Sequence, residues 1–380
     1  MGRAALELTG TPLFLWGPYC HRPLAEAVLG RDPAGVPATL PGYRVAGKDH
    51  PGLVPETGPG VEGLLLAKAT AEDCERLAFH GNVAAWARRP VRLASGGAAV
   101  MALVGTGAAD MNRIWKFADW QRRDAALAVA LARDIMALRG LRDASEVAAR
   151  RHAMQVRASS RLRAANDPLP AALRRMADPA DVAVAAFAQP YAHFFAVEEY
   201  DLSFRRFDGT HSVTVNRAVF ISGDAVTVLP YDPVRDRVLV IEQFRAGPFA
   251  RGDRNPWSLE TIAGRIDPGE TAEAAGRREA QEEAGLRLGA FLRVADYYPS
   301  PGGKAEYLYS YVALTDLPDG VAQLGGVADE AEDIRGHVIG FDRLMELVVS
   351  GEINNAPLIL SALWLQRERG RLCQPGTGPA

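Results

Sequence analysis

The spacing of apolar residues divides this chain of 380 residues into stretches with different expected folds. Residues 12–112 combine short apolar runs with frequent Gly and Pro, a pattern typical of a small β-rich or α+β domain. Residues 115–136 place apolar side chains at helical spacing, and Gly140 follows as the expected C-cap. A second helix is predicted at 145–165, and the prolines after it predict a linker.

Strand patterns return from Val182 onward. Strands are predicted at 200–207, 212–221, 225–231 and 238–242. Hairpin turns are expected at Asp208-Gly209 and Gly223-Asp224, because such pairs favour tight turns. A last helix is predicted at 357–369, followed by a disordered tail at 374–380.

Composition narrows the class of protein. The chain is 48% hydrophobic and 23% charged, as ordinary globular proteins are. Its formal charge of -3 provides no overall field for nucleic acid or an anionic membrane, so we expect neither partner. Cys20, Cys74 and Cys373 lie far apart, which disfavours a zinc site and a disulfide framework and fits a cytoplasmic protein. No run of residues reaches the length of about 18 apolar residues that a membrane helix needs.

Five arginines and no acid lie between Arg150 and Arg163. This local positive charge would favour the binding of a phosphate or an RNA strand. A solvated helix face explains the same residues and is the commoner meaning, because no aromatic or Gly-rich segment accompanies them.

The stretch 264–286 concentrates carboxylates around a helix predicted at 271–284. Glu279, Glu282 and Glu283 stand at i, i+3 and i+4, so their side chains leave neighbouring positions of one helix face. Stacked like charges repel, and a bound cation would compensate them. Mg²⁺ prefers such carboxylate oxygens and commonly binds together with substrate phosphates. An exposed, Glu-rich amphipathic helix has the same spacing, so the spacing alone leaves both interpretations open.

The whole stretch resembles the Nudix box, in which a Gly, five residues, a Glu and seven residues precede Arg-Glu-apolar-x-Glu-Glu-x-Gly-apolar. Every defined position is filled, by Gly264, Glu270, Arg278, Glu279, Ala280, Glu282, Glu283, Gly285 and Leu286. Agreement at all of these positions separates the segment from an ordinary Glu-rich helix.

The resemblance implies an α/β/α sandwich with a mixed sheet, which hydrolyses a nucleoside diphosphate linked to another group. It implies Mg²⁺, with Mn²⁺ as a substitute, on Glu279, Glu283 and the backbone carbonyl of Ala263. It also assigns Arg278 and Glu282 to the catalytic group. The metal would neutralise the diphosphate and activate a water for in-line attack.

Residues 191–370 resemble the ADP-ribose pyrophosphatase branch of this family. Pro301 follows Gly285 at the distance typical of that branch, and the segments 229–236, 241–245 and 256–260 match as well. The expected reaction is hydrolysis of ADP-ribose to AMP and ribose 5-phosphate. Two alternatives stay open: another nucleotide sugar of the GDP-mannose type, and a sensor that binds ADP-ribose without hydrolysing it.

The acidic segment 329–333 resembles the loop that completes the active site in this branch. The resemblance implies Glu330 as general base and Glu332 as a further metal ligand. A base outside the helix is reasonable because carboxylates already bound to metal have lost basicity. A solvated acidic turn explains the run equally well when it is taken alone.

The resemblance also implies the substrate contacts. Phe194 and Phe195 would stack on adenine, although such residues otherwise more often belong to a core. The remaining implied contacts are Arg217, Arg245, Arg265, Ser300, Pro301, Gly302 and Glu306. In this branch a partner subunit completes the adenine site, so a homodimer through the Nudix domain is implied.

The segment 13–30, with 40–43 and 61–63, resembles the γ-glutamylcyclotransferase-like fold. The acid/base Glu of that family's turn is replaced at Phe79-His80-Gly81, so we expect cyclotransferase activity to be lost, although a His can shuttle protons near neutral pH. Fusion of both domains resembles TrgB-type tellurite-resistance-associated proteins. The expected fold class is α/β, with a γ-glutamylcyclotransferase-like α+β domain at 1–112, a helical connector at 113–180, a Nudix domain at 181–373 and the tail at 374–380.

Overall fold

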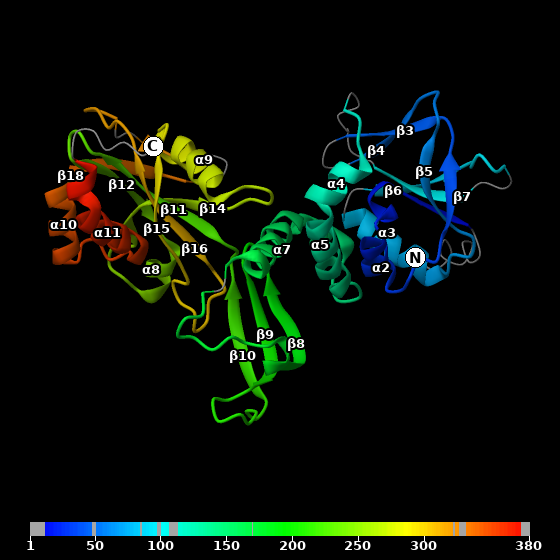
Figure 1. The fold of residues 1–380 in the computed structure, drawn as a ribbon, viewed down its shortest axis with the longest axis horizontal. Helices are drawn as coiled ribbons and strands as arrows, with labels where there is room; N and C mark the ends of the chain where they lie inside the picture. Colours follow the sequence, from blue (N-terminus) through cyan, green and yellow to red (C-terminus); the bar gives the residue numbers. More distant parts are fainter. Residues whose placement is uncertain are drawn as a thin grey trace. The chain divides into compact units, whose positions relative to one another are not determined.

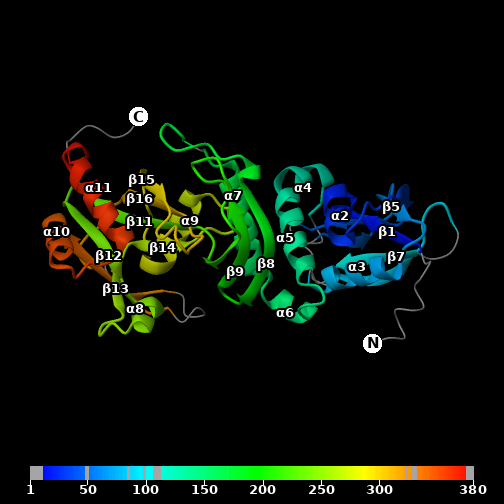
Figure 2. The ribbon, with the colours of Figure 1, turned by 90° about the horizontal axis from the view of Figure 1, so that it is seen from below.

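The protein is described from a computed structural model, which describes residues 12–47, 51–83, 86–96, 100–105, 113–168, 170–321, 324–326 and 332–373. The chain forms two compact units, Met1–Asp167 (unit 1) and Pro168–Ala380 (unit 2). Figures 1 and 2 show unit 1 in blue to teal and unit 2 in green to red. Among the described residues, no helix is both long and apolar enough to cross a bilayer.

Unit 1 is built on a five-stranded sheet with the order β2-β5-β1-β7-β6. The strands are β1 (Leu13–Trp16), β2 (Val36–Leu40), β5 (Val61–Leu66), β6 (Trp86–Val91) and β7 (Val100–Gly105). The strands β3 (Tyr43–Ala46) and β4 (Gly52–Pro55) form a separate antiparallel pair. Since β1 runs parallel to β7 and antiparallel to β5, the sheet is mixed.

Helices of unit 1 pack on this sheet and include the segment that we expected to be a connector. They are η1 (Gly17–Cys20), α2 (Arg22–Leu29), α3 (Ala71–Val83), α4 (Phe117–Arg123), α5 (Ala125–Ala137), α6 (Ala144–Ala149) and α7 (Arg151–Asn166). Trp120, Ile135 and Val147 are buried in the same core cluster as Leu15 and Leu77. The helices of the expected connector therefore belong to unit 1.

Two predicted helices are each interrupted. The first breaks at Asp124, between α4 and α5, and the second breaks at Arg150, between α6 and α7. Gly140 is not the C-cap that we expected: Leu138 caps α5, and Gly140 adopts a left-handed conformation (φ 82°) beyond it.

The expected turn at Phe79-His80-Gly81 is wrong, because these residues lie inside helix α3. His80 is buried, and its Nδ1 lies 2.6 Å from the hydroxyl of Tyr19. Burial, reinforced by the charge of Arg151, lowers the pKa of His80 to about 4. The imidazole is therefore neutral near pH 7.

Unit 2 contains two sheets. A three-stranded antiparallel sheet has the order β10-β9-β8, formed by β8 (Val182–Ala192), β9 (Ala196–Phe204) and β10 (Val215–Ile221). The short η2 (Pro179–Asp181) precedes it. The hairpin predicted at Gly223-Asp224 is wrong: β10 and β11 belong to different sheets, and Gly223 (φ 87°) turns the chain from one sheet to the other.

The second sheet of unit 2 has eight strands, with β15-β16-β11-β12-β18-β17 in one path, β13 paired to β12 and β14 paired to β11. Its strands are β11 (Ala225–Asp232), β12 (Arg237–Phe244), β13 (Trp257–Glu260), β14 (Ile262–Arg265), β15 (Phe291–Tyr297), β16 (Leu308–Leu314), β17 (Leu324–Gly325) and β18 (Ile334–Gly340). The parallel pairing of β11 with β16 makes this sheet mixed, as predicted.

Helices cover both faces of the mixed sheet. On one face, Ala275 and Ala280 of α9 (Ala272–Ala284) pack with Val228 of β11. On the other, α10 (Phe341–Ser350) and α11 (Ala356–Leu372) pack against the next residue of β11, Leu229. Successive residues of β11 thus pack into two different cores, one on each face of the sheet. This is the expected α/β/α arrangement (Figure 1). The short α8 (Ala246–Arg251) follows β12.

Candidate functional site

Helix α9 begins and ends where the sequence predicts. Thr271 is its N-cap, and the Thr271 hydroxyl accepts a hydrogen bond from the backbone N–H of Ala274 at 3.1 Å. Gly285 ends the helix with a left-handed φ of 64°. These local caps fix the register of the helix and so fix which glutamates face the sheet: Glu283 is buried, and Glu282 points to solvent.

The guanidinium of Arg278 holds the carboxylates together. Its Nη1 donates to Glu279 at 2.7 Å and to Glu282 at 3.1 Å, while its Nε and Nη2 bind both oxygens of Glu270. Nη2 also donates to the backbone oxygen of Arg265 at 3.0 Å, which ties the helix to the end of β14. Arg278 therefore pairs with Glu270 and Glu282 as well as with Glu279.

Two of the clustered acids have strongly raised pKa values. Glu283 is 3% exposed, and burial, followed by the nearby Glu279, raises its pKa to about 9. Burial also raises the pKa of Glu279 to about 7, against the opposing effect of Arg278. Glu332 contributes to both shifts, so its carboxylate lies in the same electrostatic environment. A divalent cation would stabilise the charged forms of these acids.

Strand β14 approaches the cluster closely. A Cβ added to Gly264 would lie 1.8 Å from Oε1 of Glu279, so only Gly leaves room for that carboxylate. The backbone N–H of Ala263 donates to Glu283 at 3.3 Å. Within the described ranges, no three His, Cys, Asp or Glu side chains are already gathered as a metal cage. The oxygen-rich donor set nevertheless suits a hard cation.

Arg245 lies beside this cluster. Its guanidinium binds the buried carboxylate of Glu260 with two parallel hydrogen bonds, Nη2 to Oε2 at 2.8 Å and Nε to Oε1 at 3.1 Å. Glu283 and Glu332 also help to raise the pKa of the Arg245 guanidinium. These three side chains therefore lie close enough to interact electrostatically. We did not assign a role to Glu260 from the sequence, although it ends the segment 256–260 that matched the ADP-ribose pyrophosphatase branch.

An aromatic pair, Phe194 and Phe195, lies beside Arg265 at the end of β14. The guanidinium of Arg265 lies 3.9 Å from the ring centre of Phe194 and 5.2 Å from that of Phe195. Phe194 is 66% exposed and so is not a core residue, whereas Phe195 is half-buried against Phe220. A flat, exposed ring beside a cation is a suitable surface for a purine.

The other predicted substrate residues lie near β10 and the loop before β16. Glu306 accepts hydrogen bonds from Ser222 at 3.1 Å and Lys304 at 2.7 Å. Ser300 begins a tight turn, since its carbonyl accepts from the backbone of Lys304 at 3.0 Å, and Pro301 and Gly302 are exposed within that turn. Arg217 is exposed on β10 and contacts the carbonyl of Asn216. Their roles stay predictions, and Glu330 lies outside the described residues.

Known proteins resemble much of unit 2. The family model described as NUDIX domain matches residues 222–357. ADP-ribose pyrophosphatase of Escherichia coli (strain K12) is 39% identical over 186 residues, which span 49% of this chain and 88% of that protein. The Haemophilus influenzae protein of the same name is 32% identical, over 48% of this chain and 85% of that protein.

Other similar proteins carry different names. A GDP-mannose pyrophosphatase of Salmonella choleraesuis is 33% identical over 150 residues, 40% of this chain and 77% of that protein. A crystal structure described as an ADP compounds hydrolase is 22% identical, covers 50% of this chain and 96% of that one, and has a TM-score of 0.39. The resemblance of the N-terminal segments to the γ-glutamylcyclotransferase-like fold, and with it the tellurite-resistance association, stays a prediction.

Proposed function

Because the chain belongs to the Nudix family, we propose that unit 2 hydrolyses ADP-ribose and water to AMP and ribose 5-phosphate. The observation that carries the proposal is the cluster of box acids at α9, with Glu283 buried and Glu279 packed against Gly264 of β14, in a chain 39% identical to an ADP-ribose pyrophosphatase over 88% of that protein. A structural helix has no need to bury Glu283 with a pKa raised to about 9.

Glu279, Glu283, Glu332 and the carbonyl of Ala263 would hold Mg²⁺, or Mn²⁺ in its place. A bound divalent ion supplies charge neutralisation at the diphosphate and a more acidic water. Arg278 keeps Glu279 and Glu282 in register with the loop, and the Glu260 carboxylate keeps the Arg245 guanidinium aimed beside the cluster, where it would bind a phosphate oxygen. Glu330 is our proposed base, on the resemblance alone.

The exposed ring of Phe194, with Arg265 stacked on it, supports the proposal of an adenine site. Arg217, Glu306 and the turn at Ser300–Gly302 would contact the rest of the substrate. A GDP-mannose-type substrate is the second candidate, favoured by the 33% identity to a GDP-mannose pyrophosphatase. The two candidates differ in the base and the sugar, so discrimination rests on contacts outside the box.

We also propose a homodimer through the three-stranded sheet of unit 2. Its edge strand β8 is exposed along almost its whole length, and its Val184, Phe187 and Tyr191 are 54%, 54% and 50% exposed. An unpaired edge with apolar side chains favours association. A second copy that covers this surface would lie close to Phe194, which follows the strand directly.

The test is steady-state hydrolysis of ADP-ribose beside GDP-mannose and other nucleotide sugars, with Mg²⁺ and then with a chelator. Metal-dependent release of AMP, with ADP-ribose preferred by kcat/KM, supports the proposal. Preference for GDP-mannose supports the second candidate. Tight binding of ADP-ribose without turnover of any substrate would replace the enzyme with a sensor.

A further inference from the structure

Unit 1 holds a cavity of about 520 Å³ that the proposed hydrolysis does not use. Its walls come from β5, from β3, from the turn η1 that follows β1, and from residues 114–117 before α4. A cavity of this volume accommodates a small organic molecule. All of its described lining lies within unit 1.

Most of the lining is apolar. Val45, Leu64, Trp115 and Phe117 all line the cavity, and the ring centres of Trp115 and Phe117 lie 6.1 Å apart. Both aromatic side chains are only half-buried, so each keeps part of its surface open. An apolar body would lose its contact with water against these walls, and a cation would be attracted to the aromatic faces.

Glu62 supplies the distinctive charge. It lies on β5 opposite Thr39 of β2, whose hydroxyl donates to its carboxylate at 3.0 Å. Among the residues that the structure describes, no cationic side chain forms an ion pair with Glu62. The carboxylate is exposed, which leaves an oxygen accessible to a ligand.

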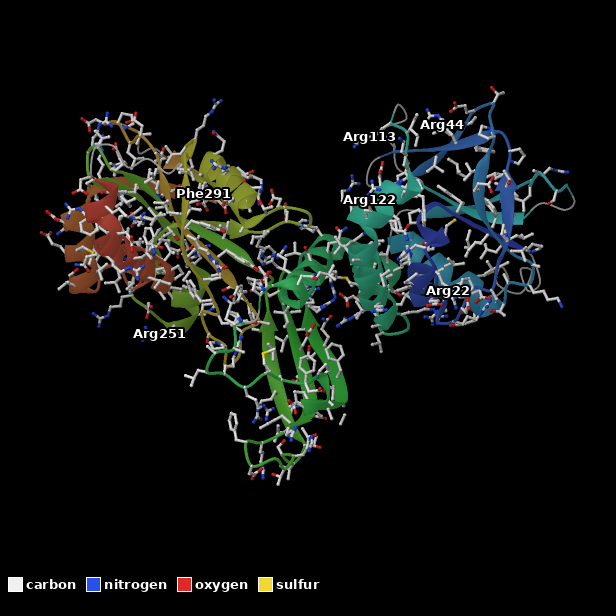
Figure 3. The ribbon with its side chains drawn as sticks, in the orientation of Figure 1. Arg22, Arg44, Arg113, Arg122, Arg251 and Phe291 are labelled. Carbon is white, nitrogen blue, oxygen red and sulfur yellow. The ribbon has the colours of Figure 1, made fainter. Side chains whose placement is uncertain are left out.

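The neighbouring polar groups do not cancel this charge. Arg44 lines the cavity on β3 (labelled in Figure 3), but its guanidinium is ion-paired with Glu56. Burial and the charge of Glu62 raise the pKa of the Cys20 thiol to about 11, so the thiol is neutral near pH 7. Since Arg44 pairs with Glu56, Glu62 is the one carboxylate of the described lining and keeps no ion-pair partner there.

We propose that this cavity is a binding site for a small organic amine, whose ammonium group pairs with Glu62 and whose apolar, aromatic body packs on Trp115 and Phe117. A cavity lined by a carboxylate and by aromatic rings favours a cation over an anion of the same size, by a charge-assisted hydrogen bond and by attraction to the rings. The site is independent of the proposed hydrolase reaction.

The experiment uses isothermal titration calorimetry on the full chain with three ligands of matched skeleton: phenethylamine, 2-phenylethanol and 3-phenylpropionate. Because Glu62 is exposed, we expect modest affinity for the amine, with a Kd on the order of 0.1–1 mM. The alcohol should bind more weakly, and the carboxylate should bind weakest.

Two matched variants locate the site. Glu62→Gln should weaken amine binding at least fivefold. Glu26→Gln, which removes a half-buried carboxylate that pairs with Arg22 on α2 of the same unit, should leave it unchanged. Both variants should hydrolyse ADP-ribose like the unmodified chain. Because the experiment measures amine binding, its result stands even if the chain does not hydrolyse ADP-ribose. No amine binding at 10 mM, equal binding of the carboxylate, or equal behaviour of the two variants would overturn the proposal.

Discussion

At the scale of single residues, charge and burial conflict most strongly at Glu283. Its carboxylate is almost fully buried, yet it lies beside Glu279 and within the field of Glu332. A protein retains such an arrangement when a ligand offsets its cost, and a divalent cation is the ligand that these oxygens favour.

Glu283→Gln keeps the shape of the side chain and removes the charge. We expect metal-dependent hydrolysis to fall by a factor on the order of 10³ or more, with little change in melting temperature, because an amide is a poor Mg²⁺ ligand and costs less to bury. Glu273→Gln, on the exposed first turn of α9, is the matched control and should retain full activity. Activity of Glu283→Gln near that of the control contradicts the proposed metal site.

The buried His80 should make the free energy of unfolding of unit 1 depend on pH. Its pKa is about 4 in the folded protein against 6.5 for a free imidazole, so the unfolded chain binds the proton more tightly. The resulting stability is present above pH 6.5 and is lost as pH falls to 4, by at most about 3 kcal/mol. Urea unfolding between pH 7 and 4 should show a flatter profile for His80→Gln, and identical slopes would exclude a buried neutral His.

At the scale of elements, the structure shows which predictions depend on neighbours in sequence. Helix α9 was predicted correctly because Thr271, Gly285 and the apolar spacing between them are local features. The hairpin at Gly223 failed because the turn residues do not specify which strands pair. Likewise β9 begins at Ala196 and ends at Phe204, earlier at both ends than the predicted strand 200–207, since its register is set by β8 and β10.

The contact between β14 and α9 supplies a test at this scale. Gly264→Ala would place a methyl group where Glu279 lies, so the carboxylate must turn away from β14. We expect kcat to fall at least tenfold while cooperative unfolding is retained. Gly247→Ala, at a position where an added Cβ meets nothing within 4 Å, is the control for the Gly-to-Ala change. Equal kcat in both variants would mean that this close approach has no catalytic role.

For the whole molecule, the resemblance predicted the box helix, which the structure confirms, and substrate roles for Phe194, Phe195 and Arg245, which stay predictions, but not the connections of these residues. The stacking of Arg265 on Phe194 and the clamp of Glu260 on Arg245 join residues from different strands and loops. No pattern among neighbouring residues of the sequence predicts such contacts. The packing of α4 to α7 into unit 1 escaped prediction for the same reason, because a helix period does not reveal which core buries the helix.

The exposed strand β8 predicts how copies of the chain associate. Phe187→Glu should convert a dimer to a monomer in sedimentation velocity, because a charge at the centre of an apolar interface is costly to desolvate. Val234→Glu, at an 87% exposed position elsewhere in unit 2, should leave the dimer intact. A chain that is monomeric before any substitution contradicts the proposed interface.

The pairing of β11 with β16 has a consequence for synthesis of the chain. Strand β11 lies at the centre of the mixed sheet, yet its parallel neighbour begins only at Leu308. A ribosome must therefore release most of unit 2 before this sheet can close, whereas unit 1 has all of its own strands much earlier. Unit 1 can fold first, whereas β11 lacks its parallel neighbour until β16 has left the ribosome.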